Sequence, residues 1–258
     1  MPKKKKNDKE NIIVYDNTFN KTSLTIFTKI QINVLFAVLS YMRDNAPKNA
    51  NEYKAVFDFN KIRERSGNKN LHTSRIKSAL DKLLKTQIEY YRDGEFTVAN
   101  VFSHYKVNDD GKVEIGLTPY MGEKLNLKSH GYTILNLDDF VMIENAYAKD
   151  LYRLLRQFKH TGLLSMRKKD FLKFFNPPKS YNEYDIIRKI LMPAIEDNKK
   201  YFENLKVNIE DNKVLPEVLC FTFKKHEKKL KEMSEREFSK LTPEEKEIYI
   251  YIENNTIY

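Results

Sequence analysis

One order of predicted secondary structure occurs twice along this chain of 258 residues. Each copy begins with an amphipathic helix and a short strand, continues through a second helix, a polar turn and a third helix, and ends with two strands. The two copies share the order of their elements and not their sequences. A chain patterned in this way is expected to fold into two units of the same architecture.

Polar turns and changes of hydrophobic period bound these elements. In the first copy the elements are predicted at 28–43, 55–59, 60–65, 72–90, 95–107 and 112–117. In the second copy they are predicted at 147–159, 163–166, 167–175, 185–201, 205–210 and 218–223. The turns at 66–70 and 176–180 separate the second helix of each copy from the third.

This order is that of a winged helix, in which a helix-turn-helix presents its last helix to DNA and a β-hairpin forms the wing. We therefore expect an α+β fold that is rich in helix and consists of two winged-helix domains in tandem. The expected divisions are a basic arm at 1–10, a first winged-helix domain at 11–125, a linker at 126–136, a second winged-helix domain at 137–226 and a charged, partly helical tail at 227–258.

The net charge of +10 is distributed unevenly. Residues 148–208 contain 14 Lys or Arg and 7 Asp or Glu, and residues 1–10 contain 5 and 2. Positive charge that is concentrated in a folded unit favours a polyanionic partner, because phosphate contacts release counterions. A solvated, lysine-rich surface is the alternative explanation.

The candidate DNA-binding residues of the second unit lie on its predicted helix-turn-helix. Basic residues at a helix N-terminus suit phosphate, and Arg, Lys and Asn on a recognition helix can pair with base edges. These candidates are Arg167, Lys168, Lys169, Lys179, Ser180, Tyr181, Asn182, Arg188 and Lys189. In the nearly neutral first unit, the corresponding candidates are Ser74, Arg75, Ser78 and Lys82.

The sequence has no pattern typical of an enzyme or a metal site. Its single cysteine excludes a disulfide framework, its five histidines are at least 26 residues apart, and the usual glycine-rich phosphate motifs are missing. The longest apolar run, 34–39, is far shorter than the ~18 residues of a membrane span. We therefore expect a cytoplasmic, non-enzymatic protein without a cofactor, a metal or a signal peptide.

Two stretches resemble the plasmid replication initiator proteins. One is the helix YAKDLYRLLRQF at 147–158, and the other is ILMPAIEDN at 190–198, where a proline stands inside a predicted helix. A proline inside a helix ordinarily costs ~3 kcal/mol, so the second stretch is the more specific of the two. The resemblance extends over 12–224 and is strongest over 132–208.

The resemblance implies a sequence-specific initiator that binds repeated origin sites (iterons) in double-stranded DNA. It also implies a first domain that mediates dimerisation, a dimer that represses its own gene, and host replication initiator and helicase proteins as partners at the bacterial plasmid. It places the recognition helix at 184–198, which adds Tyr184 to the candidates and gives Arg188 and Lys189 the base-reading role. The chain departs from the family at Ile187, where the family is often basic.

Two other functions compete with this interpretation. One is a winged-helix transcription regulator that has no initiator activity. The other is a helical interaction protein whose basic face binds acidic partners.

Overall fold

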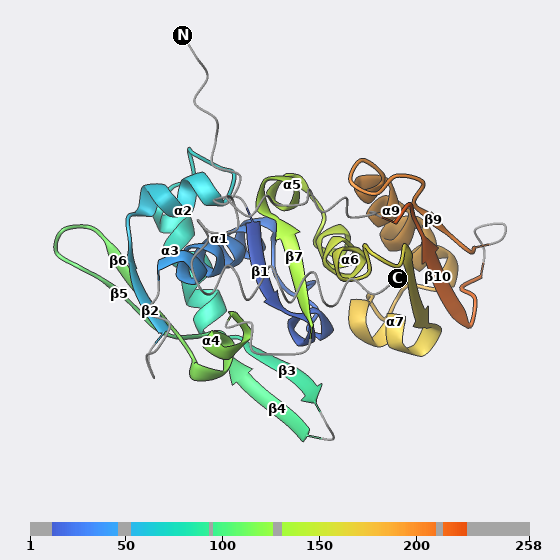
Figure 1. The fold of residues 1–258 in the computed structure, drawn as a ribbon, viewed down its shortest axis with the longest axis horizontal. Coiled ribbons are helices and arrows are strands. Elements are labelled where there is room, and N and C mark those ends of the chain that lie inside the picture. The colour runs from blue at the N-terminus through green and yellow to red at the C-terminus, as the bar shows by residue number, and fades with distance from the viewer. Residues whose placement is uncertain (1–11, 46–52, 93–94, 126–130, 210–213, 226–258) are drawn as a thin grey trace, which may run out of the picture. The chain divides into compact units, whose positions relative to one another are not determined.

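The first of two similar three-stranded antiparallel sheets lies in the N-terminal half of the chain (Figure 1). Its central strand, β6 (Val113–Leu117), pairs on one side with β2 (Tyr53–Phe57) and on the other with β5 (Phe102–Val107). The helices of this unit are α1 (Lys29–Asn45), α2 (Phe59–Arg65) and α3 (Thr73–Leu84). Strand β2 thus precedes the helix-turn-helix, and β5 and β6 form the wing.

The second sheet has the same topology. Its central strand, β10 (Val218–Thr222), lies between β8 (Leu163–Arg167) and the short β9 (Lys206–Val207). Its helices are α6 (Ala146–Gln157), α7 (Lys168–Phe175) and the continuous helical run α8 (Glu183–Ile186), η3 (Ile187–Leu191) and α9 (Met192–Lys199). The recurrence of helices and strand order confirms two winged-helix domains in tandem.

The structure is a computed structural model that describes residues 12–45, 53–92, 95–125, 131–209 and 214–225. The expected basic arm at 1–10 and the charged tail at 227–258 lie outside the described residues. Most of the tip of the second wing, at 210–213, also lies outside them.

The predicted helix at 72–90 is wrong in its last part. Helix α3 ends at Leu84, where the Thr86 hydroxyl donates to the Lys82 carbonyl oxygen at 2.6 Å. A hairpin of β3 (Gln87–Arg92) and β4 (Glu95–Asn100) follows, so the predicted single strand at 95–107 is two strands with different partners. Ile88 is buried as the helical stripe requires, but it belongs to a strand.

The predicted linker at 126–136 is wrong for its C-terminal part. Residues Tyr132–Asn136 form β7, which pairs antiparallel with β1 (Ile12–Asp16) near the start of the described chain. Three further elements were not among those predicted from the sequence: the 3-10 helix η2 (Asn17–Lys21) and the helices α4 (Pro119–Leu125) and α5 (Leu137–Met142).

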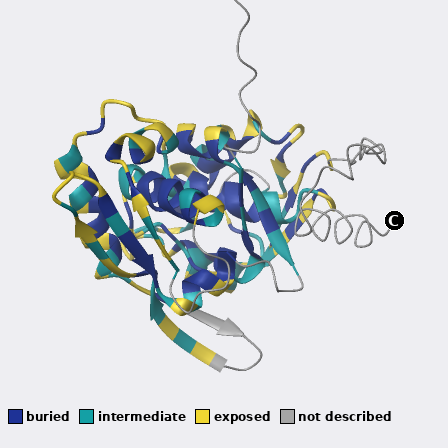
Figure 2. Cartoon of the chain, turned by 60° about the vertical axis from the view of Figure 1, so that its left-hand side comes forward, coloured by how far each residue is buried: buried dark blue, intermediate teal, exposed yellow. Residues whose placement is uncertain are grey.

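The hydrophobic core centres on α1, which is buried on most of its circumference (Figure 2). The predicted stripe of Ile32, Leu35, Phe36, Leu39 and Met42 is buried. Residues on the opposite side, such as Val34 and Val38, are buried as well. Helix α1 contacts α2 and α3 as well as β1 and α5, so it has neighbours on more sides than an amphipathic surface helix.

Helix α6 carries a buried ion pair that holds the segment leading into α1. Arg153 donates to Asp150 Oδ1 at 2.7 Å, to the Thr22 carbonyl oxygen at 3.1 Å and to the Phe19 carbonyl oxygen at 2.6 Å. The second oxygen of Asp150 accepts from the Leu24 N–H at 2.7 Å. Both charged side chains are fully buried. These bonds fix α6 to η2 and to the chain between η2 and α1.

Lys149, the neighbour of Asp150 on α6, is also fully buried. Its Nζ donates to the Phe140 carbonyl oxygen and lies 4.3 Å from the centroid of the Phe140 ring. Burial, with a smaller contribution from the positive charge of Lys29, lowers the pKa of the Lys149 amine to about 7.

Replacing Arg153 by methionine is expected to destabilise the protein by about 3–5 kcal/mol, because it leaves a buried carboxylate without its charged partner. Urea unfolding followed by circular dichroism measures this loss. The control is Lys199→Met, which breaks an exposed ion pair with Glu196 and is expected to cost less than about 1 kcal/mol. Equal losses of stability in the two variants would contradict the stabilising role of the buried ion pair.

Candidate nucleic-acid interface

The turn of the second helix-turn-helix is fixed by its backbone and by two prolines. Helix α7 ends at Phe175, and the C-cap residue Asn176 adopts the left-handed conformation (φ 42°) and donates its N–H to the Leu172 carbonyl oxygen at 3.0 Å. Pro177 and Pro178 follow and prevent α7 from continuing. The next helix begins at Asn182, whose side chain accepts from the Asp185 N–H at 2.9 Å as an N-cap.

Glu183 connects three parts of this domain. Its Oε1 accepts from Lys168 Nζ at 2.5 Å, and its Oε2 accepts from the Leu215 N–H at 2.9 Å. The hydrogen bond from Lys168 lowers the pKa of the Glu183 carboxyl, and the bond from Leu215 acts in the same direction. The starts of α7 and α8 and the segment before β10 are therefore held together at one carboxylate.

The predicted base-reading residues lie on the exposed side of the helical run α8–η3–α9, and each is paired with an aromatic ring. The Arg188 guanidinium carbon lies 5.8 Å from the centroid of the Tyr184 ring, and Lys189 Nζ lies 4.5 Å from that of the Tyr181 ring. Lys189 also donates to Asp185 Oδ1 at 2.8 Å, and this bond lowers the pKa of the Asp185 carboxyl. These contacts order the two cations before any ligand binds.

The flanking candidates differ in how far they are already engaged. Arg167 donates to Asp170 at 2.9 Å, although 65% of its side chain is exposed. Lys169, Lys179 and Ser180 are exposed, and their side chains make no hydrogen bond or ion pair with the residues that the structure describes. A phosphate could therefore bind these three residues without displacing a protein partner. Lys168 and Asn182, in contrast, have structural partners in the turn.

The first helix-turn-helix places its four candidates on one helix. Ser74, Arg75, Ser78 and Lys82 are exposed along α3. The preceding turn is held by Arg63, which donates to the Leu71 carbonyl oxygen at 2.8 Å and to the Thr73 hydroxyl at 2.6 Å.

The wing of the first domain is fixed to its third helix by one hydrogen bond. The Tyr105 hydroxyl, on β5, donates to Asp81 Oδ1 at 2.5 Å, and this bond raises the Tyr105 pKa. The sequence pattern predicted neither this bond nor the role of Arg63, because hydrophobic periodicity does not indicate which polar side chains bond to one another.

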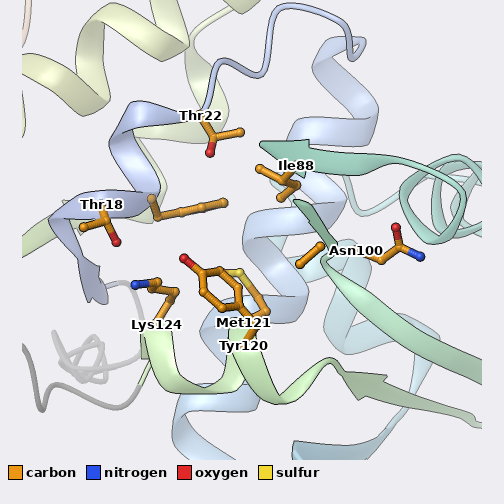
Figure 3. A pocket seen from close by; sticks show the side chains of 9 residues that line it. Thr18, Thr22, Ile88, Asn100, Tyr120, Met121 and Lys124 are labelled. Atoms are coloured by element: carbon orange, nitrogen blue, oxygen red, sulfur yellow. The ribbon is translucent and has the colours of Figure 1, made fainter. Parts of the chain in front are cut away.

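Figure 3 shows a small cavity in the first domain. It is lined by residues of η2, the base of the β3–β4 hairpin and α4, and none of them is a predicted DNA-binding residue. Its volume of about 10 Å³ has room for about one water molecule. Over the described ranges, no group of three His, Cys, Asp or Glu side chains is placed to hold a metal ion, and no helix is both long and apolar enough to span a membrane.

The family model for the initiator replication protein WH1 matches residues 12–156 of this chain, more than half of its length. A "Probable replication protein rep" of Bifidobacterium longum (strain NCC 2705) is 21% identical over 190 residues. This alignment covers 72% of the present chain and 64% of that relative, so it spans less than two thirds of the relative's length.

Two solved structures share the fold. A Pi initiator protein in complex with iteron DNA matches with a TM-score of 0.61 and 16% identity, over 85% of this chain and 99% of that chain. Domains 2 and 3 of RctB match with a TM-score of 0.50 and 13% identity, over 78% of this chain and 84% of that chain. At these identities the likeness establishes the tandem winged-helix architecture.

Replacing Glu183 by alanine is expected to cost about 1–3 kcal/mol of stability, because the buried Leu215 N–H loses its acceptor. The smaller change Glu183→Gln keeps an acceptor oxygen and is expected to cost less. Chemical denaturation measures both values. Lys169→Ala, an exposed residue next to the Glu183 partner, serves as the control and is expected to stay within about 0.5 kcal/mol of the unmodified protein. A Glu183→Ala protein as stable as this control would refute the role of Glu183.

Proposed function

This chain belongs to the initiator replication protein family, and we propose that it is a sequence-specific double-stranded DNA-binding initiator of plasmid replication. The observation that carries the proposal is the exposed face of the second recognition helix, where Arg188 and Lys189 are each ordered by an aromatic ring. Such a face suits the major groove, where Arg and Lys bond to guanine. The Pi initiator, solved with iteron DNA, supports repeated sites as the target.

The residues divide into readers and backbone contacts. Arg188 and Lys189 read base edges, with Tyr181 and Tyr184 beside them. Arg167, Lys169, Lys179 and Ser180 contact phosphates, which fixes the register of the helix on the duplex. Lys168 and Asn182 act chiefly by holding the turn. In the first domain, Ser74, Arg75, Ser78 and Lys82 contact a second part of the same site.

The remaining parts of the proposal follow from the family. The first domain, at 11–125, mediates a dimer that represses its own gene, and the second domain, at 137–226, is the main reader. Host replication initiator and helicase proteins are the further partners. The protein works by binding and not by catalysis, and its place of action is the cytoplasm, at the plasmid.

A replication assay tests the initiator role. The test plasmid contains this gene, its upstream DNA and a selectable marker, and it has no other replication origin. It is expected to be maintained in a bacterial host. The same plasmid with Arg188→Ala is expected to be lost. Loss of both plasmids, combined with binding of the protein to its upstream DNA, would favour a transcription regulator. The absence of binding to any duplex at low salt would favour a protein-interaction module.

Arg188→Ala and Lys179→Ala are expected to weaken DNA binding in different ways. Arg188→Ala is expected to cost about 1–3 kcal/mol on the repeated sites and little on random duplex, because a base contact is lost. Lys179→Ala is expected to weaken binding equally on both and to reduce the salt slope by about 0.9, because a phosphate contact is lost. Fluorescence anisotropy at several salt concentrations measures both effects.

Lys199→Ala is the matched control for the binding experiment. Lys199 is an exposed lysine near the end of α9 and is paired with Glu196. The affinity of the Lys199→Ala variant for DNA is expected to equal that of the unmodified protein. An equal loss for Arg188→Ala on cognate and random DNA would contradict base reading by Arg188.

A further inference from the structure

The buried residues of the second recognition helix repeat at a period that an α-helix cannot keep on one face. They recur in neighbouring pairs every fourth position: Ile186 and Ile187, Ile190 and Leu191, Ala194 and Ile195, and then Asn198. Four residues of an α-helix turn about 400°, which is about 40° more than one revolution. Over three repeats, the buried stripe would move about 120° around a regular helix.

A π-helical turn in the middle of this helix compensates for the drift. The Met192 N–H donates to the Ile187 carbonyl oxygen, five residues back, instead of to the oxygen four residues back. Such a turn holds one extra residue, which corresponds to about 100° of helical rotation. The buried pairs before and after the turn are therefore brought back to the same side.

Pro193 stands directly after this turn and favours it. Its nitrogen has no hydrogen and cannot make the α-helical bond to the Lys189 carbonyl oxygen, and its ring would clash with that oxygen in a regular α-helix. The π-helical turn gives the proline room. The proline and the four-residue repeat thus require the same local structure.

The two ends of the helix are anchored to different neighbours. At the N-terminal end, Glu183 is bound to Lys168 and to the Leu215 N–H. At the C-terminal end, Asn198 Nδ2 donates to the Ala148 carbonyl oxygen of α6 at 2.9 Å and to the Ala194 carbonyl oxygen at 2.8 Å. Arg188 and Lys189 lie within the π-helical turn between these anchors. Their direction therefore depends on how that turn winds.

We propose that the π-helical turn at Ile187–Leu191, stabilised by Pro193, is a positioning element that sets the sequence specificity of the second domain. It aims Arg188 and Lys189 at the bases while both ends of the helix stay packed. Pro193 acts through these two residues and touches no base. The inference rests on the proposed DNA-binding function.

Two variants test the inference, one by weakening the preference for the π-helical turn and one by removing the turn. Pro193→Ala permits the missing hydrogen bond. Deletion of Met192 combined with Pro193→Ala removes the extra residue as well, so that the buried positions follow an α-helical period. The ratio of affinities for the repeated upstream sites and for random duplex is expected to fall about tenfold in the deletion variant and severalfold in Pro193→Ala. Binding to random duplex at low salt is expected to stay unchanged.

The readout separates positioning from stability. Both variants are expected to keep the helical circular dichroism and the cooperative melting of the unmodified protein. The deletion gives the buried positions an α-helical period, and Pro193→Ala leaves the buried residues and their four-residue repeat unchanged. Glu196→Ala is the control. Glu196 is an exposed residue of the same helix beyond the π-helical turn, and the affinity ratio of this variant is expected to be unchanged. If the deletion variant does not fold, Pro193→Ala alone decides.

An unchanged affinity ratio in the folded variants would overturn the inference while leaving the proposed function intact. A lack of preference for the upstream sites in the unmodified protein would instead overturn the proposed function.

Discussion

The buried ion pair between Asp150 and Arg153 determines how the start of the described chain meets the second domain. Removing two charges from water is costly, and an ion pair alone seldom repays that cost. Here the two side chains also bond to the carbonyl oxygens of Phe19 and Thr22 and to the Leu24 N–H. The segment between η2 and α1 therefore has one favourable arrangement, and it is the one in which α6 lies against it.

Each helix-turn-helix is held by a basic side chain, but the two solutions are chemically different. In the first domain, Arg63 donates to a carbonyl and a hydroxyl across the turn. In the second domain, Lys168 forms an ion pair with Glu183, which also accepts from the wing segment. A basic residue beside such a turn is thus not by itself a phosphate contact. Lys168 is engaged within the protein, whereas Lys169 and Lys179 are exposed.

The sequence predicted what depends on local periodicity. The stripe of α1, the helix at α6 and, apart from the β3–β4 hairpin, the order of helices and strands in each winged helix were predicted, because a helix buries one side at a regular spacing. Ile88 shows the limit of this reasoning, since a buried position there fits both a continued helix and a strand. Strands β1 and β7 were missed or assigned to a linker, because their stability comes from each other across more than a hundred residues. The candidate DNA-binding residues of the second domain lie on or beside the expected helices, but the pairing of Lys168 with Glu183 is a tertiary contact that no local pattern contains.

The pairing of β1 with β7 has a consequence for the synthesis of the protein. Strand β1 is among the first described residues to leave the ribosome, whereas its partner strand and the Arg153 side chain that holds the following segment are made only after the whole first winged helix. Domains generally fold as units during translation, starting from the N-terminus. In this protein the first unit cannot be completed until α6 of the second has emerged. The nascent chain must therefore carry an unpaired strand through most of the synthesis of its first domain, a period in which the exposed edge is vulnerable to aggregation.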